Sequence, residues 1–328
     1  MDTAVPSGIL RISSADHELG NREGRFFGEG FKRVTHGLTD ITIRTTSEEA
    51  PGRVDAMARI DIPGIWSRKG DTHQRPHLST IDAMVFAAQL TGLYAAHAFE
   101  LSPTGPFLIR SLVIKAGVAP DEESLDSFAV SATHHSTHDI AALGRRLTAM
   151  DCSIGSMTVR VVVEHAVTAD TSRTEGFYAR PEDLPGPWND APYGASHFGR
   201  HQFLSDIEAD VDAHTASAEL SITTDLGGTR RAALPPTMID LFVAALQLGQ
   251  IVLYRLDGLD RATSNTLWMR GTTITPAYEA GIDDGRFHVE LAKTTKLPTA
   301  SQGTWRSGQI VATLAGMRMT CNVAHLLL

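Results

Sequence analysis

Two apolar stretches of the sequence each carry one aspartate and one glutamine at the same spacing. Asp82 is followed by Gln89 in the first stretch, and Asp240 is followed by Gln247 in the second. Seven residues make two helical turns, so each pair lies on nearly one face, about 10 Å apart along the axis. An acid near a helix start can act as a base or position a substrate hydroxyl. We therefore predict that the aspartates are catalytic and that the glutamines bind substrate. The alternative is structural, with the aspartates as helix caps and the glutamines bonded to backbone.

Two histidines lie shortly before the first stretch. His73 and His77 are further candidates for proton transfer, because imidazole titrates near neutral pH. The matching positions before the second stretch hold Arg231 and Pro235. This difference predicts one active half and one half that has lost the chemistry. The alternative is that both histidines are solvated or cap-bonded loop residues.

A third group of candidates comes from the segment RFFGEGFKRVTH, residues 25–36. Its charged residues Arg25, Glu29 and Lys32 are predicted to bind a polar substrate, and the glycines between them allow close approach. Trp66, Arg68 and Lys69 are predicted to line the same site. The alternative is that the phenylalanines of the segment dock it as a strand and that Trp66 and Arg68 support a turn.

The two stretches are predicted to be core helices. Each opens with a capping-box pattern, Ser79-x-x-Asp82 and Thr237-x-x-Asp240. After Asp82, which completes this pattern, no Asp, Glu, Lys or Arg occurs in the first stretch until Glu100. A helix that is apolar nearly all round belongs in a core. About 20 apolar residues can also span a membrane, but Gln, Thr and Gly interrupt both runs, so we expect no membrane segment.

Composition limits the class of protein. The chain has 328 residues, which predicts two domains, and 42% hydrophobic residues, which is ample for a core. A net charge of −9 argues against a nucleic-acid partner. The N-terminus lacks a basic region followed by an apolar run, so we expect no signal peptide and a cytoplasmic location.

No metal or cofactor is expected. The two cysteines, Cys152 and Cys321, have neither a disulfide pattern nor a metal-ligand spacing. His134, His135 and His138 form a cluster, but no acid or cysteine completes a zinc pattern. Phosphate-binding loops and dinucleotide fingerprints are also absent from the sequence.

The two halves of the sequence repeat one order of elements. Asp82 and Asp240 are 158 positions apart, close to half of the chain. In each half, alternating strand-like segments precede the helix and three more follow it. We predict residues 1–170 as an N-terminal arm plus the first repeat, 171–198 as a linker and 199–328 as the second repeat. This order predicts an α+β double hotdog fold, in which each curved antiparallel sheet surrounds a central helix. The alternative is a generic pair of α+β domains.

The segment 25–36 resembles the N-terminal motif of the avirulence protein D (AvrD) family. Residues 75–82, RPHLSTID, are similar to the same family, and the resemblance extends along the chain. The family is associated with making syringolides, which are acyl-glycoside elicitors. The resemblance implies a transferase of secondary metabolism that condenses a β-ketoacyl thioester, on acyl-carrier protein or coenzyme A, with a small sugar such as xylulose. A homodimer is also expected.

The hotdog expectation places an acyl chain beside a central helix, at the seam between two hotdogs. First-turn N–H groups would there polarise a thioester carbonyl. Thioester dehydratases carry a histidine before the helix and an acid on it, but Asp82 follows His73 by nine positions, which is not their spacing. The alternatives are a dehydratase or thioesterase of the same fold and a non-catalytic module that binds an acyl lactone.

Overall fold

The computed structural model describes residues 8–101, 105–168, 173–184, 186, 197–224, 235–277, 284–299 and 303–327. The chain forms two compact units. The α2 unit consists of Val34–Ile62 and Pro76–His197, and the α3 unit consists of Met1–Arg33, Pro63–Arg75 and Phe198–Leu328. Each unit is described by itself.

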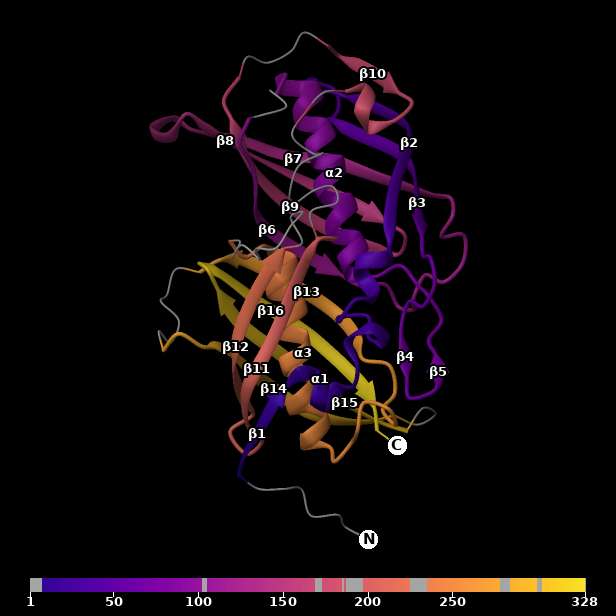
Figure 1. Ribbon diagram of the computed structural model, residues 1–328. Coiled ribbons are helices and arrows are strands. Elements are labelled where there is room, and N and C mark those ends of the chain that lie inside the picture. Colours follow the sequence, from indigo (N-terminus) through magenta and orange to yellow (C-terminus); the bar gives the residue numbers. More distant parts are fainter. Residues whose placement is uncertain are drawn as a thin grey trace. The chain divides into compact units, whose positions relative to one another are not determined.

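The α2 unit is one antiparallel sheet with one long helix (Figure 1). The strand order is β10-β2-β3-β7-β8-β9-β6. The strands are β2 (Thr35–Arg44), β3 (Arg53–Asp61), β6 (Phe107–Lys115), β7 (Phe128–Ile140), β8 (Arg145–Ile154), β9 (Met157–Ala166) and β10 (Glu175–Tyr178). Short 3-10 turns lie at Ala141–Leu143 and Pro181–Asp183.

Helix α2 (Thr80–Phe99) lies at the centre of this unit. It contacts β2, β3, β6, β7, β8 and β9. The predicted capping box is present, with Ser79 as the cap. Nearly every residue of the helix is buried, which agrees with its lack of a charged face.

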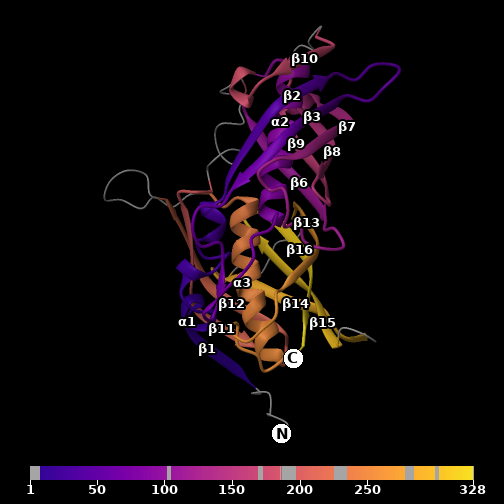
Figure 2. The same cartoon turned by 90° about the vertical axis from the view of Figure 1, so that its right-hand side faces the viewer.

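The α3 unit repeats this architecture around helix α3 (Met238–Leu256), whose capping box is also present. Figure 2 shows α3 lengthwise, with β11 and β12 on one side and β14 and β15 on the other. The strand order is β1-β11-β12-β14-β15-β16-β13. The strands are β1 (Ile9–Ser14), β11 (Arg200–Asp210), β12 (Thr215–Thr224), β13 (Trp268–Pro276), β14 (Phe287–Thr299), β15 (Gly303–Leu314) and β16 (Met317–Leu326). An antiparallel sheet around one long helix is the arrangement of a hotdog fold.

Smaller elements complete the α3 unit. They are helix α1 (Ala15–Leu19), the 3-10 turns Arg22–Gly24 and Gly30–Arg33, and a hairpin of β4 (Arg68–Lys69) and β5 (Thr72–His73). Among the described helices, α3 is long and apolar enough to cross a membrane, but 89% of its most apolar window is buried inside the protein. It is therefore a core helix.

The two sheets share their irregularities as well as their order. The β2–β3 register shifts between Thr39 and Thr42, and the β11–β12 register shifts between Ser205 and Glu208. Asp40 and Asp206, inside these shifts, both have positive φ, 52° and 47°. Another pair of shifts occurs in β6 and β13. A β-bulge fixes which side chains face the helix, so equivalent positions can be read across the two sheets.

Several sequence predictions differ from this structure. The sequence predicts three strands after each helix, whereas in the described chain β6–β10 follow α2 and β13–β16 follow α3. The prediction missed β8, and the last strand it places in the second half is two strands, β15 and β16, joined by a turn. Residues 8–33, assigned to the first repeat, pack with the α3 unit through β1, which pairs with β11. Within the predicted linker, β10 pairs with β2. Residues 171, 172, 185 and 187–196 of that linker lie outside the described residues.

Candidate functional site

A buried histidine–aspartate pair lies at the start of α2. His36 comes from β2 and Asp82 from the first turn of the helix. His36 Nε2 and Asp82 Oδ1 are 2.7 Å apart, and the two side chains are 3% and 2% exposed. The other carboxylate oxygen accepts the Ser79 N–H at 2.7 Å. Asp82 therefore caps the helix and contacts a titratable base at the same time.

The hydrogen bonds assign the ring nitrogens of His36. An ionised carboxylate is acceptor-only, so Nε2 donates to Asp82, and Nδ1 holds the lone pair whenever the ring is neutral. In the part of the chain that the structure describes, Nδ1 makes no hydrogen bond. The ring meets Phe86 edge-on, with centroids 5.1 Å apart, and His197 at 6.0 Å. A neutral imidazole oriented by a buried acid is the arrangement of a general base.

The corresponding place in the α3 unit holds different side chains. Gln202 precedes the bulge of β11 by three residues, as His36 precedes the bulge of β2. Its Nε2 donates to Asp240 Oδ1 at 2.7 Å. Arg200 adds a buried ion pair, with Nη2 at 2.5 Å from Asp240 Oδ2. Neither amide nor guanidinium releases a proton near neutral pH, so this aspartate is held as an ion pair and not beside a base.

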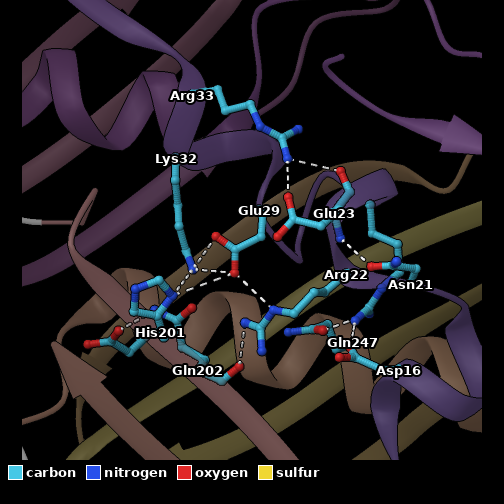
Figure 3. Close-up of polar contacts among 12 residues, drawn as sticks. Asp16, Asn21, Arg22, Glu23, Glu29, Lys32, Arg33, His201, Gln202 and Gln247 are labelled. Carbon is cyan, nitrogen blue, oxygen red and sulfur yellow. Dashed lines mark hydrogen bonds and ion pairs between the residues drawn. The ribbon is translucent and has the colours of Figure 1, made fainter. Parts of the chain in front are cut away.

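Residues 25–33 of this segment fold against α3 and carry a polar network (Figure 3). Arg25 donates from Nη1 to Gln247 Oε1 at 2.7 Å and also pairs with Asp16. Glu29 accepts from Lys32 at 2.9 Å and from Arg22 at 2.9 Å. Four of the predicted substrate-binding residues, Arg25, Glu29, Lys32 and Gln247, thus fall into two contacting pairs.

Burial and neighbouring charges shift the pKa values of the residues in this network. It lowers the pKa of Arg25 to about 10. Burial also lowers the pKa of Lys32, although Glu29 opposes that shift. Burial alone would raise the pKa of Glu29, but the ammonium of Lys32 and the guanidinium of Arg22 lower it. The carboxylate is therefore held ionised between two cations.

Aromatic packing accompanies these polar contacts. Phe26 lies 4.6 Å from Trp66 between ring centroids, and Phe27 meets Phe242 of α3 at 5.8 Å. Trp66 is buried. The phenylalanines thus dock the segment, as the alternative held, but residues 25–33 form turns and a 3-10 helix and not a strand.

The other predicted residues are more dispersed. Arg68 and His73 are exposed in the β4–β5 hairpin of the α3 unit, and Arg231 lies outside the described residues. His77 belongs to the α2 unit and is half-buried, as is Gln89 on α2. His73 and His77, predicted as a pair, thus belong to different units. Within the described ranges, no group of three His, Cys, Asp or Glu side chains is placed to hold a metal ion.

Two site residues were missed in the sequence. His36 ends the segment 25–36, but its contact with Asp82 was not predicted from the sequence. Arg200 was not identified as a site residue. The contact between His36 and Asp82 depends on strand–helix packing, which spacing along the chain does not reveal. The available signal was a histidine at the start of a predicted strand, in the same half as an aspartate on a core helix.

Comparison with known protein families identifies the family to which the chain belongs. The model of the family "Pseudomonas avirulence D protein (AvrD)" matches residues 11–328. The chain belongs to the AvrD family. No protein of curated function matches it in sequence.

Solved structures with a related chain path are distant. A TesB protein of Mycobacterium avium subspecies paratuberculosis is 10% identical, with 83% of this chain and 92% of that chain covered and a TM-score of 0.35. An acyl-ACP thioesterase of Bacteroides thetaiotaomicron is 10% identical over 76% and 90%, with a TM-score of 0.33. A polyketide synthase dehydratase domain of Brevibacillus brevis is 11% identical over 87% and 96%, with a TM-score of 0.31. TM-scores of this size indicate only a loose structural similarity. The functional roles are therefore argued from the residues of this chain alone.

Proposed function

We propose that the chain is a double hotdog that arose by duplication. Both units have one capped helix and a seven-stranded sheet of matching order. Bulges recur at equivalent places in β2 and β11 and in β6 and β13. Shared irregularities support common descent more strongly than a shared order of elements, because a bulge is not required by the fold.

We further propose that the protein is a cytoplasmic biosynthetic enzyme, a transferase that condenses a β-ketoacyl thioester with a small ketose such as xylulose. The observation that carries the proposal is the buried His36–Asp82 pair at the start of α2 in a chain of the AvrD family. The thioester would arrive on acyl-carrier protein or coenzyme A. The product would be an acyl glycoside or lactone of the syringolide type, and the enzyme is expected to act as a homodimer.

In the first step, His36 Nδ1 accepts the proton of a sugar hydroxyl while Asp82 stabilises the imidazolium. The sugar oxygen attacks the thioester carbonyl, the C–O bond forms and the C–S bond breaks. The proton then passes from His36 to the departing thiolate, so that one ester and one thiol leave. The positive end of the α2 dipole would stabilise the carbonyl oxygen as it gains charge.

In the second step, the methylene between the two carbonyls of the new β-keto ester loses a proton. Its carbon attacks the ketone of the sugar and closes a ring, and the proton returns to the new alkoxide. His36 can serve both proton transfers, because it is neutral again after the thiol leaves.

The test is incubation of the purified protein with a β-ketoacyl thioester, with and without xylulose. We expect thiol release that requires the sugar, followed by a product whose mass equals that of the thioester plus the sugar, less the released thiol. Absence of thiol release with every acyl length and small ketose tried would overturn the proposal.

A second candidate follows from the same pair. A histidine held by an aspartate can also activate water or remove a proton beside a thioester carbonyl, which gives a thioesterase or a dehydratase. Either activity would consume the thioester without sugar. Binding of an acyl lactone without turnover would instead identify a ligand-binding module.

A further inference from the structure

Two neighbouring cations of the α3 unit lack an acidic partner. Lys69 Nζ donates to the Ser264 carbonyl at 3.1 Å, to the Ser264 hydroxyl at 3.2 Å and to the Asn265 carbonyl. Arg261 Nη1 donates to the carbonyl of Arg68 at 2.7 Å. Within the described chain, neither Lys69 nor Arg261 forms an ion pair, although both are half-buried.

Most other partly buried arginines of this unit behave differently; Arg286, which donates to the Ser217 hydroxyl and the Asp206 carbonyl, is the exception. Six of them are paired with a carboxylate: Arg22 with Glu29, Arg25 with Asp16, Arg33 with Glu23, Arg200 with Asp240, Arg255 with Glu18 and Arg306 with Asp257. The chain carries a net charge of −9, so acids are plentiful. Removing a cation from water is costly unless a counter-charge accompanies it. The two unpaired cations are therefore costly in the ligand-free protein.

Contacts place the segment that carries Arg25 beside the residues that precede β4. Lys69 follows Arg68, whose carbonyl holds Arg261. The segment that carries Arg25 packs on the residues just before β4, with Phe26 4.6 Å from Trp66 between ring centroids. The Arg25 side chain is 4% exposed, and its Nε has no hydrogen-bond partner among the residues that the structure describes.

The electrostatics agree with this grouping. Burial, and then the positive charge of Arg261, lower the pKa of Lys69 to about 8. Burial lowers the pKa of Arg25 to about 10, and Arg261 contributes to that shift as well. Arg261 thus lowers the pKa values of both Lys69 and Arg25, which places it electrostatically close to each of them.

We propose that Lys69, Arg261 and Arg25 bind a phosphate monoester. A phosphate dianion would match the two unpaired charges, and guanidinium groups bind its oxygens through charge-assisted hydrogen bonds. This inference goes beyond the proposed function: it assigns a ligand site to the α3 unit by itself, and a ketose phosphate is the expected source of the phosphate group. A phosphate group of coenzyme A has the same chemistry and is the other source.

The test measures binding by calorimetry to the full chain, without acyl thioester and without turnover. The probes are inorganic phosphate, xylulose 5-phosphate, xylulose and coenzyme A. The variants are Arg261→Gln and Lys69→Gln. Arg11→Gln serves as the matched control, because Arg11 is an exposed arginine of β1 in the same unit and its loss changes the net charge equally.

We expect phosphate to bind the wild type and the Arg11→Gln protein equally, within about twofold. Loss of one charged hydrogen bond should weaken binding by roughly tenfold or more in each of the other two variants. Xylulose 5-phosphate binding more tightly than coenzyme A would assign the site to the sugar, and the reverse order would assign it to the carrier and overturn the sugar assignment.

Failure of phosphate to bind the wild type, or equal binding by all variants, would overturn the site itself. Melting temperatures of the ligand-free proteins provide a second readout. Removal of an unpaired buried cation should leave the melting temperature of Arg261→Gln unchanged or raised. A large drop would indicate a structural role for Arg261 instead. Because no condensation is measured, these results stand apart from those of the thioester assay.

Discussion

The substitution His36→Gln separates catalysis from folding, because the α3 unit already contains its counterpart. Gln202 occupies the equivalent position of β11 and donates to Asp240 at 2.7 Å. A glutamine at position 36 should likewise donate to Asp82 and preserve the helix cap. It cannot accept a proton, however, so the general base is lost while the hydrogen bond remains.

Both magnitudes follow from these contacts. General-base catalysis contributes about 10²–10⁴-fold to rate, so turnover of the thioester should fall by about that factor. One hydrogen bond is exchanged for another, so the free energy of unfolding should change by roughly 1 kcal/mol or less. Asp82→Ala differs, because it also removes the cap and leaves His36 buried without its acceptor. It should cost roughly 2–4 kcal/mol of stability.

The assay is thiol release in the presence of xylulose, combined with urea denaturation of each variant. His138→Gln is the matched control, since it makes the same replacement at an exposed residue of β7 in the same unit. Its turnover should stay within about twofold of wild type, as expected for an exposed site. Turnover of His36→Gln within tenfold of wild type would refute the assignment of His36 as the base.

Three other predictions concern charge and burial. Arg200→Met leaves the Asp240 carboxylate buried without its cation, so the free energy of unfolding should fall by about 3–5 kcal/mol in urea denaturation; an unchanged value would contradict the buried ion pair. Burial raises the pKa of the Cys152 and Cys321 thiols to about 12, so neither should react with iodoacetamide at pH 8 until the protein is denatured, as mass spectrometry can determine. The folded-state pKa of Lys69 is about 8, below its ordinary value of 10.5, so the unfolded chain holds the extra proton between these values. Raising the pH from 8 to 10 should then stabilise wild type by ~1–3 kcal/mol relative to Lys69→Met, and a constant difference would argue against the low pKa.

Much of the fold could be predicted from the sequence because its signals are local. Each core helix is defined by a hydroxyl cap, an acid three residues later and a long run without charge, all within one segment. The strands that were missed lack such local boundaries. Between β15 and β16 only Ala315 and Gly316 form the turn, both with positive φ. A two-residue turn leaves the hydrophobic pattern almost unbroken, so two strands were predicted as one.

The site was harder to predict, because its members meet through tertiary structure. Asp82 was found from its place on an apolar helix, but its partner lies 46 residues earlier in the chain. That distance along the chain carries no periodicity, and the pairing depends on the register of β2 against the helix. The same reason applies to Asp240, whose partners Arg200 and Gln202 come from β11.

The pairing of β1 with β11 affects how the protein is made. Ile9 is matched with Asp210, so the first strand of the chain has no partner until about two hundred further residues have been synthesised. At ribosomal rates of about 5–20 residues per second, that wait is roughly 10–40 s. During this time Ile12 and Leu19, both buried in the finished protein, are open to chaperones or to other nascent chains. The α3 unit is thus completed only after β11 has been synthesised, from segments that lie far apart in the sequence.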